Sequence, residues 1–253
     1  MRDTEMKALI LNSGMGTRMG MLTSQHPKCM TEISDQETIL GRQLKMLTQA
    51  GITQVVITTG PFEGTLMDYC RSLELPVELI FVHNPDYAST NYIYSIYLAR
   101  ELLDDDILLM HGDLVFEDAV LDALLDSKVS CMAVSTTLPL PKEDFKAVVR
   151  DGKITQVGIE FSQDAVAAQP LYFLRREDWR FWLNEIVSFC EHGETTCYAE
   201  NALNALGGAC PIAPLDVAEQ LCAEVDDPSD LAAVSARLRE VANRTSICVS
   251  PLI

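Results

Sequence analysis

The sequence predicts an α/β fold with a mixed, mostly parallel β-sheet, helices on both of its faces, and a smaller lobe. Two observations support this prediction. Over roughly the first 110 residues, short apolar runs alternate with segments of helical periodicity, which is typical of parallel strands joined by helices. From residue 129 the pattern changes to closely spaced strands. We therefore expect one domain over residues 1–253, with a first half over 1–128 and a second half over 129–253.

The first half begins with a buried apolar strand, and its later strands are β-branched or apolar runs that end in glycine or polar residues. Gly51 marks the end of the first long helix, and Asn91 can cap the third. Ligands of such sheets bind beyond the carboxyl ends of the strands. In order, we expect strand 8–11, helix 38–50, strand 54–59, helix 64–73, strand 77–82, helix 92–103 and strand 107–111.

The second half contains the dipeptide Asp151-Gly152, which is the strongest hairpin signal in the chain. Trp179 and Trp182 lie on the apolar stripe of a predicted helix. Pro228 suits the first turn of a terminal helix. We expect strands 130–136, 145–150, 153–159 and 171–174, helix 176–190, a strand over 215–226 that returns to the sheet, and helix 228–242.

The chain is acidic. Its formal net charge of −18 disfavours nucleic acid and anionic membranes as partners. No apolar stretch approaches the roughly 20 residues that a membrane span requires. The eight cysteines are scattered and contain no C-x-x-C pair, so we expect reduced thiols rather than a zinc site or disulfides. Together these observations predict a cytoplasmic protein that binds neither nucleic acid nor a membrane.

The loop after the first strand contains Gly14, Gly16 and Arg18, and the pair Pro27-Lys28 follows. It lacks the G-x-x-x-x-G-K-[ST] pattern of the P-loop. A dinucleotide-binding loop is only weakly supported, because Gly20 is one position too late for G-x-G-x-x-G. Two interpretations remain. The loop is either an ordinary turn with structural glycines, or its amides wrap a triphosphate that Arg18 and Lys28 neutralise.

The pattern L-x-x-G-x-G-x-R followed by P-K resembles the signature of the nucleotidyltransferases of the sugar-nucleotide pyrophosphorylase fold, LAAGxGTR and then PK. Within them the chain is most similar to the small cytidylyltransferases that activate phosphocholine or phosphonates. Further matches are NPDYASTNYIYSIYLA (84–99), HGD (111–113) and EVDDPSDL (224–231), so the resemblance spans nearly the whole chain. It implies a Rossmann-like sheet of the nucleotide-diphospho-sugar transferase type. The first half would bind the nucleotide, and the second would face the substrate and carry a returning metal strand.

The chain departs from this pattern at two places. Asn12-Ser13 stands where relatives have two alanines, and His111 stands where many have the first aspartate of Asp-x-Asp. Asp113 still ends a buried strand at the expected ligand edge, where a carboxylate can bind Mg²⁺ or start a turn. The resemblance implies that Asp113 and Asp226 bind Mg²⁺, with Asp227 as the alternative to Asp226.

The reaction that the resemblance implies is attack of a substrate oxygen on the α-phosphorus of CTP, with release of pyrophosphate. Arg18 and Lys28 would be the catalytic cations, Arg18 on the β- and γ-phosphates and Lys28 on the α-phosphate. Such transfer requires mainly positioning and charge neutralisation. The base and ribose would be contacted by the loop and by a later polar segment. These expected contacts are Leu11, Asn12, Ser13, Gly14, Gly16, Thr17, Asn84, Ser89, Thr90 and Asn91.

For the substrate, the resemblance implies a lysine that holds a phosphonate or phosphate, and aromatic and acidic side chains around a cationic head. Lys146 could instead be an outward-facing strand residue, and Trp179 a core residue. By analogy we favour 2-aminoethylphosphonate, then phosphocholine, and less strongly a sugar 1-phosphate. A nucleotide-sensing protein without activity is a further alternative. The expected substrate contacts are Lys146, Glu160, Tyr172, Trp179, Tyr198 and Glu200.

Overall fold

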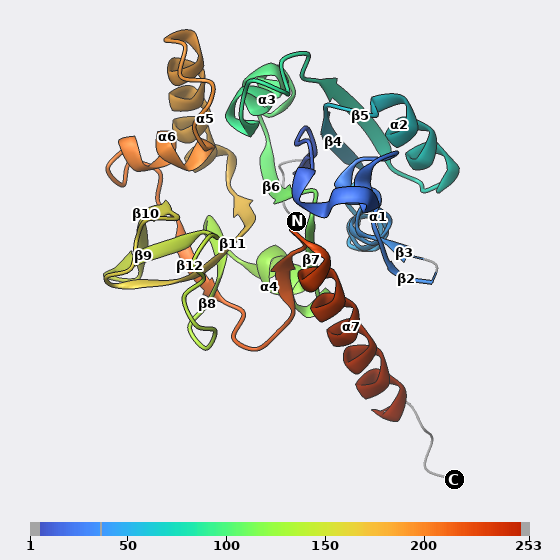
Figure 1. The fold of residues 1–253 in the computed structure, drawn as a ribbon. Helices are drawn as coiled ribbons and strands as arrows, with labels where there is room; N and C mark the ends of the chain where they lie inside the picture. Colours follow the sequence, from blue (N-terminus) through green and yellow to red (C-terminus); the bar gives the residue numbers. More distant parts are fainter. Residues whose placement is uncertain (1–5, 36, 249–253) are drawn as a thin grey trace.

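The structure, a computed structural model, describes residues 6–35 and 37–248, with side chains to residue 243. Its strands form one large mixed sheet and two small sheets, and helices cover both faces of the large one (Figure 1). The fold class predicted from the sequence is confirmed. The strands are β1 (Met6–Leu11), β2 (Glu32–Ser34), β3 (Glu37–Thr38), β4 (Gln54–Thr59), β5 (Glu78–His83), β6 (Asp106–His111), β7 (Leu114–Phe116), β8 (Cys131–Ser135), β9 (Lys146–Arg150), β10 (Lys153–Gly158), β11 (Ala165–Leu174), β12 (Ala213–Asp216) and β13 (Cys222–Glu224).

The five helices predicted from the sequence are present in the predicted order, with two differences in length. Two further short helices, over 118–126 and 199–205, were not predicted. The helix expected over 92–103 turns into a 3-10 turn after Ala99, and the terminal helix continues to Cys248. The helices are α1 (Ile39–Gln49), α2 (Glu63–Ser72), α3 (Tyr92–Ala99), α4 (Asp118–Asp126), α5 (Arg176–Glu191), α6 (Ala199–Ala205) and α7 (Pro228–Cys248), and the 3-10 turns are η1 (Thr17–Thr23), η2 (Lys28–Met30) and η3 (Arg100–Leu102).

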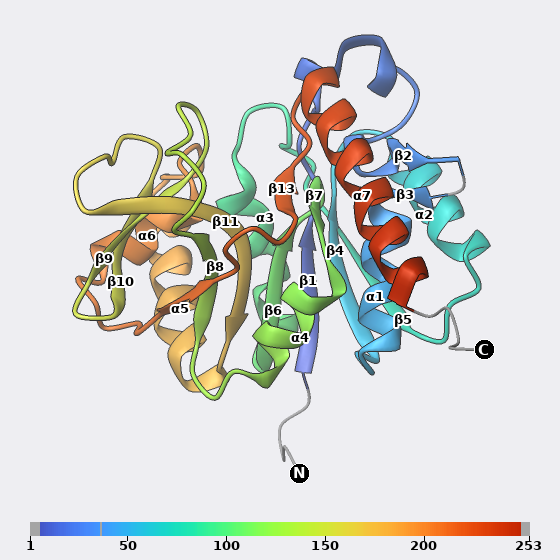
Figure 2. The ribbon, with the colours of Figure 1, turned by 90° about the horizontal axis from the view of Figure 1, so that it is seen from below.

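The first half of the sheet is parallel, in the order β6-β1-β4-β5. Leu9 of β1 pairs with Val56 of β4 on one side and with Leu109 of β6 on the other. Because these strands run in the same direction, their carboxyl ends meet at one edge. Figure 2 shows the loop after β1 and the start of α7 at this same end of the molecule.

Side chains on opposite faces of the sheet form two separate cores. Along β1, Leu9 and Leu11 pack with α3, α5 and α6, whereas Ala8 and Ile10 pack with α1, α2 and α4. All four side chains are buried, as expected of a strand with helices on both faces. The apolar run predicted at 8–11 therefore supplies both cores.

The second half of the sheet is joined to the first through β11, which runs antiparallel to β6. Strands β8 and β9 also pair antiparallel with β11, and β10 forms the outer edge. The β9–β10 hairpin turns at Asp151 and Gly152, and both have the positive φ angles (50° and 71°) that a tight hairpin turn requires. The predicted hairpin is confirmed.

The strand predicted over 215–226 is wrong as a single element. The chain forms β12, which joins the large sheet beside β8, and then β13, which pairs only with β7 in a separate small sheet. Between them Ala218 adopts a left-handed conformation (φ 49°), and Asp216 accepts from its backbone N–H at 2.9 Å. This turn breaks the extended run that the sequence suggested.

Within the described part of the chain, no helix is both long enough and apolar enough to cross a membrane. The seven cysteines whose side chains are described are free thiols, most of them buried. The side chain of Cys248 lies outside the described residues. A cytoplasmic location, which we expected from the cysteine pattern, stays a prediction.

The tryptophan stripe of α5 is fully buried. The indole N–H of Trp179 donates to the Leu103 carbonyl (3.0 Å), and its ring packs edge-on against Trp182 at 5.5 Å between centroids. Trp179 is therefore a core residue, and its expected contact with substrate is wrong. The neighbouring Phe181 on the same helix is 52% exposed.

Replacing Trp179 with alanine should lower the free energy of unfolding by about 3–5 kcal/mol, because it removes a fully buried indole and leaves the Leu103 carbonyl without its partner. Urea unfolding followed by fluorescence and circular dichroism measures this change. Phe181→Ala is the matched control and should change the value by no more than about 0.5 kcal/mol. Equal effects of the two variants would contradict the burial seen here.

Candidate active site

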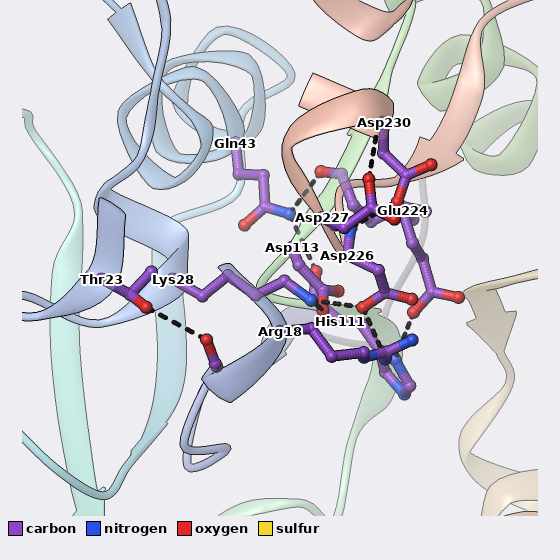
Figure 3. Close-up of polar contacts among 12 residues, drawn as sticks. Arg18, Thr23, Lys28, Gln43, His111, Asp113, Glu224, Asp226, Asp227 and Asp230 are labelled. Atoms are coloured by element: carbon purple, nitrogen blue, oxygen red, sulfur yellow. Dashed lines mark hydrogen bonds and ion pairs between the residues drawn. The ribbon is translucent and has the colours of Figure 1, made fainter. Parts of the chain in front are cut away.

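The glycine loop folds back and packs against Lys28, which follows it in the sequence. Gly16 adopts a left-handed conformation (φ 62°), and a Cβ placed there would lie 3.1 Å from Lys28 Cβ. The hydroxyl of Thr23 donates to the Gly16 carbonyl at 3.0 Å and holds the turn (Figure 3). Gly16 therefore allows both the reversal of the chain and the approach of Lys28.

The ends of three parallel strands approach each other at the base of this loop. The Gly112 N–H donates to the Leu11 carbonyl at 2.9 Å, and a Cβ on Gly112 would lie 2.4 Å from Asn12 Oδ1. A Cβ on Gly60, which follows β4, would likewise lie 2.4 Å from the Ser13 carbonyl oxygen. Glycine at 60 and 112 is therefore required for this close packing.

The small β7–β13 sheet brings the two predicted metal residues together. Glu224 pairs with Leu114, and the Val225 N–H donates to the Asp113 carbonyl at 3.0 Å. Asp226 then follows directly beside Asp113 (Figure 3). The alternative, Asp227, is turned away, because its carboxylate accepts from the backbone of Ser229 at 2.6 Å at the start of α7.

Two cations of the loop face these carboxylates. Lys28 Nζ lies 2.5 Å from Asp113 Oδ2 and 2.5 Å from Asp226 Oδ1, and Arg18 Nη2 lies 2.8 Å from the same oxygen of Asp226. Burial lowers the pKa of Lys28, but the two carboxylates outweigh it and hold that pKa above its usual value. Burial raises the pKa of Asp113, but Lys28 and, to a smaller extent, His111 more than reverse this effect and hold that pKa below its usual value.

Two further titratable residues lie beside Asp113, and we did not expect them in the site. His111 Nδ1 lies 3.0 Å from Glu224 Oε1, and both side chains are largely buried. Burial lowers the pKa of His111, but the hydrogen bond to Glu224 and the charge of Glu224 outweigh burial. The pKa of His111 is therefore raised above its usual value. Burial raises the pKa of Glu224. Each residue precedes an expected metal ligand by two positions, a spacing that places it on the same side of an extended chain.

A cavity of about 440 Å³ opens between the loop and the second half. Arg18, Lys28, Asp113 and Asp226 line one side of it. Its other side is aromatic. The ring of Tyr198 lies 5.8 Å from that of Tyr92 and 5.2 Å from that of Phe145. The expected nucleotide contacts that line the cavity are Leu11, Asn12, Gly14, Gly16, Thr17, Thr90 and Asn91.

Three expected nucleotide contacts lie elsewhere. Ser13 lines an adjoining cavity of about 140 Å³. Asn84 is buried, and its amide donates to the hydroxyls of Thr90 and Ser95, both at 3.0 Å. The hydroxyl of Ser89 donates to a backbone carbonyl within the same turn. Asn84 and Ser89 therefore shape the 84–91 segment and do not line the main cavity.

Most of the expected substrate contacts are corrected by the structure. Tyr198 lines the cavity, but Glu160 is exposed and is not among its lining residues. The ammonium of Lys146 is buried and donates to three backbone carbonyls, so it holds the start of β9. Tyr172 is fully buried, as Trp179 is.

Glu200 acts on the cavity indirectly. Its buried carboxylate accepts from the hydroxyl of Tyr172 at 2.8 Å and from that of Tyr92. Burial, with the nearby Glu200 charge, raises the pKa of both tyrosines well above the usual range. Both tyrosines are therefore neutral donors, and Glu200 orients the Tyr92 ring that lines the cavity.

A glycine loop whose cations meet carboxylates at one side of a cavity can hold a triphosphate and the metal that accompanies it. On this sheet, that arrangement is typical of a nucleotidyltransferase domain. Residues 8–188 match the family described as MobA-like NTP transferase domain, and the chain belongs to this family.

The relatives in sequence are nucleotidyltransferases that act on phosphorylated or phosphonylated small molecules. The CMP-5'-(3-aminopropyl)phosphonate synthase of Streptomyces rubellomurinus is 32% identical over 238 residues, which are 88% of this chain and 37% of the relative. The chain thus spans well under half the length of that relative. The CTP:phosphoglutamine cytidylyltransferase of Campylobacter jejuni is 25% identical over 74% of this chain and 78% of its own length.

Solved structures share the fold. The CTP:phosphocholine cytidylyltransferase of Streptococcus pneumoniae superposes with a TM-score of 0.73 at 20% identity, over 92% of this chain and 99% of that one. At this level of identity, the similarity shows the fold alone.

Gly112→Ala should lower the free energy of unfolding by about 1–3 kcal/mol, because the added methyl group must displace Asn12 and the end of β1. Gly14→Ala, in the loop after β1, is the matched control, since a Cβ there meets no atom within 4 Å. The free energy of unfolding of the control should stay within about 0.5 kcal/mol of that of the original protein. Chemical denaturation measures both values. A Gly112→Ala protein as stable as the control would show that the strand ends are farther apart than they are here.

Proposed function

We propose that the protein transfers the CMP group of CTP to a small phosphonate or phosphate monoester and releases pyrophosphate. The observation that carries this proposal is the meeting of Arg18 and Lys28 with Asp113 and Asp226 on one side of the cavity. The two sequence relatives described above support it, because both are named for products or substrates of cytidylyl transfer.

The two cations would divide the phosphates of CTP between them. Arg18 is 61% exposed at the cavity, so it can reach the β- and γ-phosphates of the leaving group. Lys28 is held deeper, at the ends of the strands, and would contact the α-phosphate, where charge develops during transfer. The attacking phosphonate or phosphate oxygen is already ionised at neutral pH, so no general base is required.

A divalent cation fits the carboxylate side of the cavity. Asp113 Oδ1 is buried and has no hydrogen-bond partner among the described residues, and the donors beside it are largely carboxylate oxygens, which Mg²⁺ prefers. We propose that Asp113 and Asp226 hold Mg²⁺. A bound ion of this kind supplies positive charge next to the phosphates. In the structure Asp226 is held by Arg18 and Lys28, and anionic phosphates would compete for both cations.

The other side of the cavity suits a cationic tail on the acceptor. The aromatic rings of Tyr92, Phe145 and Tyr198 lie there, and Glu143 and Asp144 add negative charge. A primary amine prefers carboxylates, whereas a quaternary ammonium prefers aromatic faces. Both kinds of group are present, so an ω-aminoalkylphosphonate, with 2-aminoethylphosphonate as first choice, is our proposed acceptor and phosphocholine the alternative.

A pyrophosphate-release screen tests the proposal. It crosses CTP, UTP, dTTP, ATP and GTP with 2-aminoethylphosphonate, 3-aminopropylphosphonate, phosphocholine and glucose 1-phosphate, in the presence of Mg²⁺. We expect release with CTP and an aminoalkylphosphonate. Release only with glucose 1-phosphate and another nucleotide would favour a sugar-nucleotide enzyme. The absence of release with every combination would favour a nucleotide-binding protein without activity.

Lys28→Met should reduce kcat by about 10²–10³-fold, because it removes a positioned cation next to the developing charge. Circular dichroism should confirm that the variant is folded. Lys153→Met is the control, since Lys153 is exposed at the start of β10 and does not line the cavity. A Lys28→Met enzyme with the kcat of the control would refute the role given to Lys28.

A further inference from the structure

The position expected for a metal between Asp113 and Asp226 is taken by a cation of the chain itself. The Lys28 ammonium lies 2.5 Å from an oxygen of each carboxylate. Asp226 also carries Arg18 at 2.8 Å. The carboxylate of Asp226 is therefore already paired with two cationic side chains, and a metal ion would have to displace these side chains.

Asp113 has a second oxygen that these cations do not use. Oδ1 is buried and has no hydrogen-bond partner among the described residues. One carboxylate oxygen of Asp113, one of Glu224 and a ring nitrogen of His111 lie within 4.8 Å of one another. Figure 3 shows that all three side chains converge beside Lys28 and Asp226.

We propose that His111, Asp113 and Glu224 form a metal site that binds a divalent transition-metal ion, of the Mn²⁺ or Co²⁺ type, before the nucleotide arrives. Ligands about 2.1 Å from one ion lie about 3.0–4.2 Å apart, so the three side chains need to move closer together only slightly to share an ion. The ion replaces the proton between His111 Nδ1 and Glu224 Oε1, now 3.0 Å apart, and that proton leaves to solvent.

The imidazole nitrogen sets the choice of metal. Mg²⁺ is a hard ion that takes oxygen ligands, whereas an imidazole adds affinity for manganese, cobalt and later ions of the series. At this position, the chain has a histidine where the family pattern often has an aspartate. A site of one nitrogen and two carboxylates therefore binds Mn²⁺ more tightly than Mg²⁺, and Co²⁺ more tightly than Mn²⁺.

The surroundings hold the histidine in place, as metal sites require. The Tyr92 ring packs edge-on against the His111 ring, with 4.8 Å between centroids. Tyr92 is fixed in turn by its hydrogen bond to the buried Glu200. The role of the ion, which is to add positive charge beside the phosphates, rests on the proposed function, but the binding of the ion does not.

Binding of Mn²⁺ to the nucleotide-free protein tests the inference, with electron paramagnetic resonance as the readout of free Mn²⁺. We expect one ion per chain, bound at least 10-fold more tightly than Mg²⁺ in competition. His111→Gln should weaken Mn²⁺ binding at least 10-fold. Glu160→Gln is the matched control, and it should change the affinity less than 3-fold, because Glu160 is exposed and does not line the cavity.

A second measurement needs no variant. Electron spin-echo modulation of the bound Mn²⁺ in the unaltered protein should contain the coupling of an imidazole nitrogen. Absence of this coupling overturns the inference. So does a mutational pattern in which Asp226→Asn abolishes binding and His111→Gln does not weaken it. Because no nucleotide is present, a failed pyrophosphate screen together with intact Mn²⁺ binding would refute the proposed function and leave the metal site standing.

Discussion

The contact of Lys28 with Asp113 and Asp226 is the interaction on which the site depends. It joins the end of the first loop to a residue 198 positions later and to the end of a central strand. A buried ion pair of this kind contributes little net stability, because both groups lose their hydration. Removing one partner is costly, however, since it leaves a buried charge uncompensated. The pair therefore fixes the geometry of the site more than it stabilises the fold.

This contact is possible only because the backbone is closely packed beneath it. Gly60 and Gly112 let the strand ends come within contact of Ser13 and Asn12, and Gly16 lets the loop fold back onto Lys28. The β7–β13 pair, which stands apart from the large sheet, then delivers Asp226 to Asp113. Each of these features is a local backbone requirement that positions a charged side chain.

The second half of the chain contributes through buried polar contacts. Glu200 links Tyr172 in the core to Tyr92 at the cavity, and Lys146 ties together the backbone around the start of β9. Lys146 and Glu200 were expected to contact the substrate, but they instead position residues that line the cavity. A charged or aromatic side chain in a lobe facing a ligand can serve either purpose, and only its neighbours decide which.

The sequence alone determined the alternating strands and helices of roughly the first 110 residues, the hairpin at Asp151-Gly152 and the loop carrying Arg18 and Lys28, because periodicity and turn chemistry are local properties. Which side chains meet was decided only by the tertiary structure. It buried Trp179 and Tyr172, divided the expected strand over 215–226, and brought His111 and Glu224 beside Asp113. These outcomes depend on pairing between distant strands and on which face of an element becomes covered. Neither is a property of any single segment of the chain.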